Sequence, residues 1–281
     1  MNFREFLTLI KVRITGLVTL TAAAGYGLSP KAGWEWSFVG VLVGVFFITA
    51  GASAVNMFME RRTDALMNRT RQRPLPRNLL SPAKALAIGV ALSLVGVAAL
   101  IPAGLLATSI AIASWILYVL VYTPLKSRTS LNTVVGAIPG ALPPLIGWAA
   151  TGAPLSMVAL LPFLLMVAWQ IPHFLALAWM YREDYAKGGL HMLSVHDEDG
   201  RMVGRQALLY AICLIPITAA PLLAHRGAIM GVILGVGMSI VFVFFAARFA
   251  RHRDRKTAAS LFGVSLLYLP CAFAAMFLSR L

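Results

Sequence analysis

The chain has 281 residues, of which 59% are hydrophobic and only 12% are charged, and its mean hydropathy is +0.81. Because a typical soluble domain is about one quarter charged, this composition excludes a soluble enzyme and a disordered chain. The apolar stretches are continuous and do not alternate with polar residues, which excludes a transmembrane β-barrel. We therefore expect an all-α, polytopic membrane protein.

Nine hydrophobic segments follow one another along the chain, each close to the roughly 20 residues that a membrane-spanning helix needs. They lie at 10–29, 37–59, 82–101, 105–122, 131–150, 155–179, 206–224, 227–247 and 257–279. The first span begins without a cleavable leader pattern, which is typical of a bacterial inner-membrane protein. The two inter-span segments at about 60–81 and 180–205 are much longer than the other connections.

Basic residues are strongly segregated by this nine-span arrangement. Of the 24 Lys and Arg residues, all except Lys31, Arg226 and Arg280 fall on the side of the N-terminus. The positive-inside rule makes that side cytoplasmic, so we expect the N-terminus inside the cell. The net charge of +14 therefore reflects membrane topology, with anionic lipid as a secondary partner, and does not indicate nucleic-acid binding.

The cytoplasmic end of the second span carries three oxygen-bearing side chains at intervals of four residues. These are Asn56, Glu60 and Asp64, which share one face of a helix. Carboxylates at this spacing repel each other, and an amide inside the membrane must find partners. A bound Mg²⁺ would remove both costs, because it takes hard oxygen ligands together with substrate phosphates.

Cationic side chains surround this acidic cluster. Arg69, Arg71 and Arg73 lie in the loop that follows it, Lys126 ends the fourth span, and Arg13 begins the first. Guanidinium groups suit bidentate contacts with phosphate. Together with the acids, these residues predict a site for a magnesium-bridged diphosphate at the cytoplasmic face.

A second acidic pair and an intramembrane histidine complete the candidate site. Glu183 and Asp184 follow the sixth span and offer the same chemistry as the first cluster. His173 lies within that span, next to Pro172 and one turn from Gln170. Polar groups at such a depth are candidates for a functional role, and the proline favours a loosened helix beside an internal cavity.

Three segments carry a family resemblance. They are NMFMERRTDALMNRTRQRPLP (56–76), YTPLKSRTSLNTVVGAIPGALPPLIG (122–147) and IPHFLALAWMYREDYAKGGLHMLSV (171–195). They resemble the heme-modifying branch of the UbiA-type intramembrane prenyltransferases. The chain departs from the pattern of that branch at Ile171, where a proline is usual, and across 188–194, where A-G-x-P-M-L-P is common.

The resemblance implies nine transmembrane helices around a central cavity, formed by one prenyltransferase domain over 1–281 with the loops 60–81 and 180–205 capping the site. It implies Mg²⁺-dependent transfer of a farnesyl group from farnesyl diphosphate to a vinyl group of heme b, which supplies the cofactor of heme-copper oxidases. Asn56, Glu60, Asp64 and Asp184, with Glu183, would bind metal. Arg13, Arg69, Arg71, Arg73 and Lys126 would bind diphosphate. His173 would lie in the heme pocket, and heme A synthase or oxidase assembly proteins would be partners.

Two other functions remain open on the sequence. A prenyltransferase of the same superfamily acting on a quinone or phenolic acceptor would share the acidic and basic motifs, although the P-H-F segment favours heme. A transporter would also use intramembrane polar residues and broken helices, but the charged residues cluster at one face and no pair of inverted, interrupted spans is evident.

Overall fold

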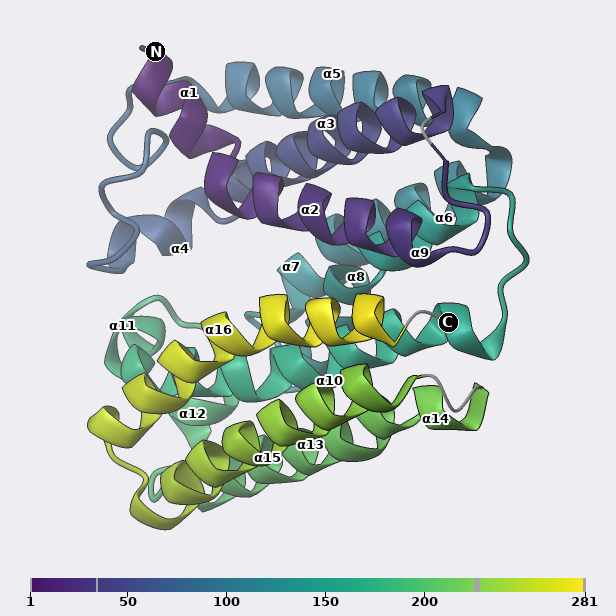
Figure 1. Ribbon diagram of the computed structural model, residues 1–281. Coiled ribbons are helices and arrows are strands. Elements are labelled where there is room, and N and C mark those ends of the chain that lie inside the picture. The colour runs from purple at the N-terminus through teal and green to yellow at the C-terminus, as the bar shows by residue number, and fades with distance from the viewer. Residues whose placement is uncertain (1, 34, 225–227, 280–281) are drawn as a thin grey trace.

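The computed structural model describes residues 2–33, 35–224 and 228–279, and these residues form helices without a single strand (Figure 1). In chain order the helical elements are α1 (Phe3–Leu9), α2 (Val12–Leu28), α3 (Trp36–Met59), α4 (Arg61–Leu66), α5 (Pro82–Leu100), η1 (Ile101–Ala103), α6 (Leu105–Ile116), η2 (Leu117–Tyr122), α7 (Thr123–Leu125), α8 (Asn132–Ala141), α9 (Pro143–Ala150), α10 (Met157–Met180), α11 (Arg182–Lys187), α12 (Leu193–His196), α13 (Arg201–Ala219), α14 (Pro221–Ala224), α15 (Ile229–His252) and α16 (Arg255–Leu278).

The expected all-α membrane fold is confirmed. Within the described ranges, eight helical segments are long and apolar enough to cross a membrane, and the bent pair α1–α2 makes a ninth if it is counted as one span. The first span was predicted as one helix over 10–29. In the structure it is broken at Lys11, with a bend of 52° between α1 and α2. Lys11 adopts a left-handed conformation with φ 48°. Of the three bases expected on the far side, Arg226 and Arg280 lie outside the described residues.

The spans form two groups that correspond to the two halves of the chain (Figure 1). Helices α2, α3, α5, α6 and α9 make up one group, α10, α13, α15 and α16 make up the other, and α7 and α8 lie between them. One apolar core lies within the first group, and a larger one joins the second group to α8, α9 and the end of α2. The charged connections α4 and α11 lie together at one end of the bundle (Figure 1), so the polar chemistry is concentrated there.

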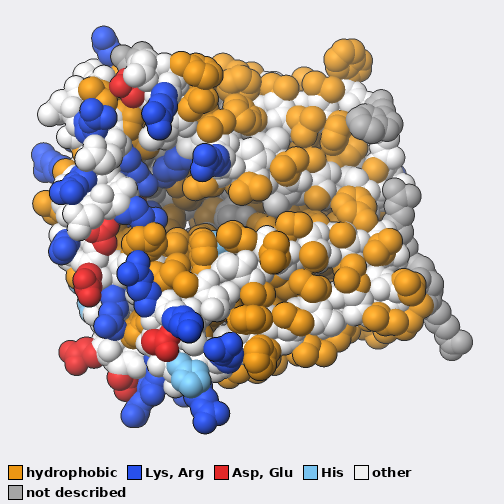
Figure 2. Space-filling view, turned by 60° about the vertical axis from the view of Figure 1, so that its left-hand side comes forward, with side chains coloured by type: hydrophobic (Ala, Val, Ile, Leu, Met, Phe, Trp, Pro, Cys, Tyr) orange, Lys and Arg blue, Asp and Glu red, His pale blue; other side chains and the backbone are white. Residues whose placement is uncertain are grey.

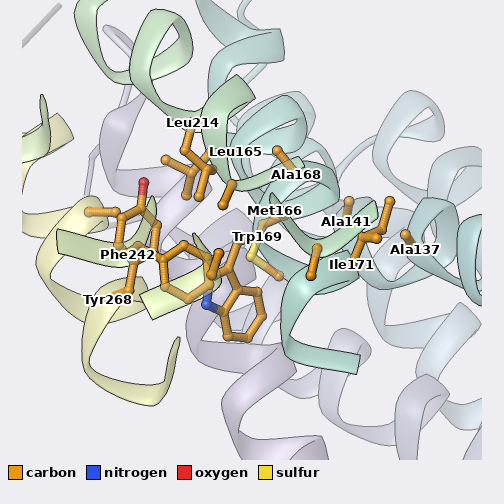
Figure 3. Close-up of a cluster of buried hydrophobic side chains, with 14 of the residues drawn as sticks. Ala137, Ala141, Leu165, Met166, Ala168, Trp169, Ile171, Leu214, Phe242 and Tyr268 are labelled. Atoms are coloured by element: carbon orange, nitrogen blue, oxygen red, sulfur yellow. The ribbon is translucent and has the colours of Figure 1, made fainter. Parts of the chain in front are cut away.

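Large aromatic side chains hold the second half together (Figure 3). Phe242 and Tyr268 stack with ring centroids 5.0 Å apart, and both are completely buried. The Trp169 indole packs in the same cluster and donates a hydrogen bond to the carbonyl of Ser265, at 2.8 Å. Buried polar atoms are thus satisfied across helices, as an apolar interior requires.

Glycines allow the helices of the first half to approach closely. A Cβ added to Gly147 on α9 would collide with the carbonyl oxygen of Ala22 on α2, and one added to Gly96 on α5 would collide with the backbone of Ile48 on α3. Small residues at helix crossings are typical of membrane proteins. The fifth span is broken at Leu142 into α8 and α9, where Pro143 and Pro144 follow each other.

We predict that Gly147→Ala destabilises the protein by about 1–3 kcal/mol, the usual cost of overpacking, because the new methyl group would separate α2 from α9. Gly237→Ala is the matched control, since no atom lies within 4 Å of a Cβ at that exposed position in α15. Thermal unfolding in detergent should show a lowered melting temperature for the first variant alone. Equal melting temperatures would contradict the close approach of α2 and α9.

Candidate active site

The junction of α3 and α4 presents the first acidic cluster. The helix loses regular geometry at Glu60, but the four-residue spacing is kept, because the Glu60 amide donates to the Asn56 carbonyl at 2.9 Å and the Asp64 amide donates to the Glu60 carbonyl at 2.8 Å. Asn56 and Asp64 are fully buried. The three oxygen-bearing side chains therefore lie one turn apart, as their spacing predicted.

Each member of the cluster contacts a different cation. Lys11 Nζ donates to Asn56 Oδ1 at 2.7 Å. Lys126 Nζ lies 2.7 Å from Glu60 Oε1. Arg73 donates through one Nη to both carboxylate oxygens of Asp64, at 2.7 and 2.8 Å. The cations come from three separate parts of the chain, so this set of contacts joins α1–α2, the 67–81 loop and α7 to the end of α3.

A π-helical turn places Lys126. Pro124 has no N–H to give to the preceding turn, and the hydroxyl of Thr123 instead donates to the Tyr118 carbonyl at 2.9 Å. The chain widens into the π-helix Leu117–Tyr122 at this point, a feature often found at functional sites. Thr123 Oγ1 also accepts a hydrogen bond from Asn56 Nδ2 at 3.0 Å, which ties the turn to the acidic cluster.

The loop after α4 folds back to bring Arg73 to Asp64. The hydroxyl of Thr70 donates to the Asp64 carbonyl at 2.9 Å, and the Arg73 amide donates to the Thr70 carbonyl at 2.9 Å. Thr70 is buried, so this turn is fixed by contacts inside the protein. The loop thus contributes Arg73 to the acidic cluster.

The cations set the ionisation of the acids. Burial alone would raise the pKa of Glu60, but Lys126 and Lys11 outweigh burial and hold it below the usual range. Burial raises the pKa of Asp64, and the Arg73 guanidinium limits the rise. For Lys126, burial would lower the pKa, but the Glu60 carboxylate raises it above its usual value. Glu60 and Lys126 therefore form a charged pair at neutral pH.

In the second acidic pair, Asp184 binds backbone N–H groups of the loop after α4. Both oxygens of Asp184 accept backbone N–H groups, from Asn68 at 2.7 Å and Arg69 at 3.0 Å. Arg69 in turn donates to the hydroxyl of Tyr185 at 3.0 Å and lies over the rings of Tyr181 and Tyr185. Asp184 thus anchors this loop to α11.

Of the predicted residues, Arg69 and Asp184 contact each other's segments and not the first cluster, and three more lie at the surface. Arg13, Arg71 and Glu183 are exposed, and Lys11, two residues before Arg13, takes the place expected for Arg13. Within the ranges that the structure describes, no group of three His, Cys, Asp or Glu side chains is close enough to hold a metal ion.

His173 lies in the other half of the molecule, on α10. Its ring is stacked between Trp169 and Phe262, with centroid distances of 4.9 and 4.7 Å. Its Nδ1 is 2.6 Å from the hydroxyl oxygen of Ser265 on α16. Because the Ser265 hydroxyl donates to the Phe262 carbonyl, it accepts from Nδ1, which leaves Nε2 as the unprotonated nitrogen.

A space-filling view shows how these features are arranged at the surface (Figure 2). Lys and Arg side chains gather at one end of the molecule, and a hollow opens beside them between the two halves (Figure 2). The remainder of the visible side is mostly hydrophobic (Figure 2). The site therefore lies where the protein could bind one molecule that has a charged head group and an apolar tail.

The contacts of Asp184 lead to a testable prediction. Asp184→Ala should release the loop around Asn68 and Arg69, because two backbone N–H groups lose their acceptor. Hydrogen exchange of residues 67–73 should then become faster by about tenfold or more, as the loss of about 1.4 kcal/mol implies. Glu183→Ala removes the neighbouring exposed carboxylate and should leave exchange in this loop unchanged. Equal exchange in both variants would contradict the anchoring role.

Known proteins similar to this chain point to one family. The family model described as "UbiA prenyltransferase family" matches residues 14–280. The chain is 37% identical to a protoheme IX farnesyltransferase of Solibacter usitatus over 99% of both chains. It is 38% identical to the protein of that name from Anaeromyxobacter dehalogenans, over 99% of this chain and 94% of the relative.

Solved structures share the fold at much lower identity. A structure described as digeranylgeranylglyceryl phosphate synthase in membranes superimposes with a TM-score of 0.83 at 17% identity, covering 99% of this chain and 98% of that one. A UbiA homologue from Archaeoglobus fulgidus bound to GPP and Mg²⁺ gives 0.72 at 18% identity, covering 97% and 99%. The extent of these matches shows that the chain is an integral membrane protein of the UbiA prenyltransferase family.

Proposed function

We propose that this protein transfers a farnesyl group from farnesyl diphosphate to a vinyl group of heme b, giving heme O and diphosphate. The observation that carries the proposal is the 37% identity, over 99% of both chains, to a relative named protoheme IX farnesyltransferase. The buried cluster of acids and cations at the polar end of an apolar bundle supports it, because a prenyl diphosphate has one highly charged end and one apolar end.

The donor set at the end of α3 fits Mg²⁺. Asn56, Glu60 and Asp64 offer only oxygen atoms, and Mg²⁺ is typically held by one or two carboxylates together with substrate phosphates. A relative in the same fold class is bound to GPP and Mg²⁺. When bound, Mg²⁺ would supply positive charge across the diphosphate oxygens. These three side chains would hold it, and no third carboxylate is required.

Lys11, Arg73 and Lys126 would stabilise the departing diphosphate. Each already donates to an oxygen-bearing side chain of the acidic cluster, so each is directed at the point where the phosphates would bind. Cleavage of the allylic C–O bond leaves the electron pair on diphosphate and a carbocation on the farnesyl group. Fixed cations in a buried site stabilise that leaving group strongly, because they need no reorganisation during the reaction. Arg13, Arg69 and Arg71 would supply outer contacts to the phosphates.

The apolar walls would protect the farnesyl cation from water until the acceptor reacts. The heme vinyl group would supply the electron pair for the new C–C bond, and the positive charge would then pass to the porphyrin side. Water adds its oxygen there and loses a proton, which gives the hydroxyl group of the product. His173, with Trp169 and Phe262 on its two faces, would contribute to the heme pocket.

We further propose that residues 1–281 form one catalytic domain in a bacterial inner membrane, with the active site facing the cytoplasm. The positive-inside rule supports this orientation, because the acidic cluster and nearly all basic residues share one side. Asp184, with Glu183, would act as the second acidic element that closes the site. Heme A synthase or oxidase assembly proteins are the partners we propose.

Incubation of purified protein in lipid with heme b, farnesyl diphosphate and Mg²⁺, followed by mass analysis of the porphyrin, tests the proposed function directly. We expect a product with an added farnesyl group and one added hydroxyl group. Chelation of divalent metal should abolish its formation, and added Mg²⁺ should restore it. Unmodified heme, with prenylation of an added quinone or phenol, would show that the acceptor is different, and flux of a solute without chemistry would favour a transporter.

Asp64→Ala should reduce kcat by about 10²–10³-fold or more, the usual effect of removing one group that stabilises a leaving group. Asp199→Ala is the matched control, because Asp199 is an exposed carboxylate paired with Arg201 outside the site. Both variants should elute as folded protein and bind detergent equally. Near-normal turnover by Asp64→Ala would remove Asp64 from the metal site.

A further inference from the structure

A second basic cavity lies beside the proposed active site, with a volume of about 600 Å³. It opens between the end of α10, helix α11 and the turn from α15 to α16, and the loop residues Asn68 and Arg69 close one side. Lys11, Arg73 and Lys126 do not line it. The cavity is therefore distinct from the buried cluster at the end of α3, although Arg69, Glu183 and Asp184 belong both to its lining and to the outer part of the proposed active site.

The lining of this cavity has a positive charge that the protein does not neutralise. Five cations face it, namely Arg69, Arg182, Lys187, Arg253 and Arg255, against the carboxylates of Glu183, Asp184 and Asp254. Two of these carboxylates already accept hydrogen bonds from the protein. Asp184 accepts from the backbone N–H groups of the loop, and Asp254 accepts from the amide and the hydroxyl of Thr257. No ion pair links any of the five cations to a carboxylate among the described residues.

Two of the cations are held in position by aromatic rings. The guanidinium of Arg182 lies 4.4 Å from the ring centroid of Trp179, and that of Arg69 lies 5.2 Å from the centroid of Tyr181. Stacking of this kind restrains a guanidinium while its N–H groups stay available to an anion. The cavity thus has fixed donors on the α10–α11 side.

Backbone strain at the α15–α16 turn, on the other side of the cavity, also indicates a ligand site. Arg253 ends α15 in a left-handed conformation with φ 54°, which glycine adopts freely and a long side chain adopts only at a cost. Strained residues of this type concentrate at ligand sites. A glycine would form the same turn without strain, but it would remove a cation from the cavity.

We propose that this cavity binds a pair of negatively charged groups carried by a membrane-embedded molecule. The five cations exceed the three carboxylates by two charges, which a dianion would neutralise. α10 and α16 are spans, and the cavity lies at their charged ends, at the level of a membrane surface. The ligand chemistry is therefore carboxylate or phosphate attached to an apolar body.

Two sources supply that chemistry. One is the pair of propionates on heme b, the acceptor in the proposed function, on which this arm of the inference rests. His173 supports that source, because it is seven residues before Met180 of the cavity wall and so lies on the same face of α10, about two turns deeper. The other source is the phosphate of an anionic lipid, for which basic pockets at span ends are known binding sites.

The test uses a double variant, Arg253→Gly with Arg255→Gln, in the full-length protein. Its matched control is Arg248→Gln with Arg251→Gln, which removes two exposed cations from the last turns of α15 outside the cavity. Because Arg253→Gly relieves backbone strain, the melting temperature of the double variant should not fall. Three ligands are titrated, namely heme b and its dimethyl ester by their absorbance, and phosphatidylglycerol in nanodiscs by native mass spectrometry.

We expect the double variant to bind one of the charged ligands at least about tenfold more weakly than the wild type and the control. Weaker binding of heme b, with unchanged binding of the dimethyl ester, assigns the cavity to the propionates. Weaker binding of phosphatidylglycerol alone assigns it to lipid phosphate. Unchanged binding of both overturns the proposal. Since these are binding measurements, absence of farnesylated product in the wild type would reject the proposed function and leave this test intact.

Discussion

The contact between Lys126 and Glu60 is the interaction on which the charged end of this protein depends. It joins two spans that are 66 residues apart in the sequence, at a depth where each charge would be costly without the other. Lys11 and Arg73 repeat the arrangement with Asn56 and Asp64. Since each cation comes from a different element, the α1–α2 junction, the loop after α4 and the π-helical turn are all held to one helix end.

This arrangement explains why the polar residues lie at one end of an otherwise apolar bundle. The larger core joins the second half to Leu28 of α2 and to Leu145 and Trp148 of α9, and the spans of the first half approach through glycine contacts that leave little room for movement. A rigid bundle positions the end of α3 and the end of η2 accurately. The connecting loops are then free to supply Arg73 and Asp184, which complete the site.

Hydropathy and charge alone predicted the spans, because continuous apolar stretches and segregated bases are direct consequences of the membrane. The four-residue spacing of Asn56, Glu60 and Asp64 likewise predicted a common face, since helix geometry is local. Lys11 was not assigned to the site, because its position depends on a left-handed break that no residue type nearby requires. A helical continuation of the first span would have favoured Arg13.

The interactions that sequence reasoning missed are all long-range. The hydrogen bond from Asn56 to Thr123 spans 67 residues, and the π-helical turn that positions Thr123 is visible only as a Thr-Pro pair in the sequence. The anchoring of the loop after α4 by Asp184 spans 116 residues. A carboxylate beside a basic loop suggests metal binding as readily as it suggests backbone capping, and only the fold shows which N–H groups it meets.

The amide at position 56 has a consequence for the charge of the site. Its Nδ2 donates to Thr123 while its Oδ1 accepts from Lys11, so an aspartate here would lose the donor to Thr123 and require that hydroxyl to turn away from the Tyr118 carbonyl. The amide also leaves three cations opposite only two carboxylates. The basic side chains of the resting cluster thus outnumber its carboxylates by one, whereas a third carboxylate would match them in number and weaken the attraction of the site for an incoming anion.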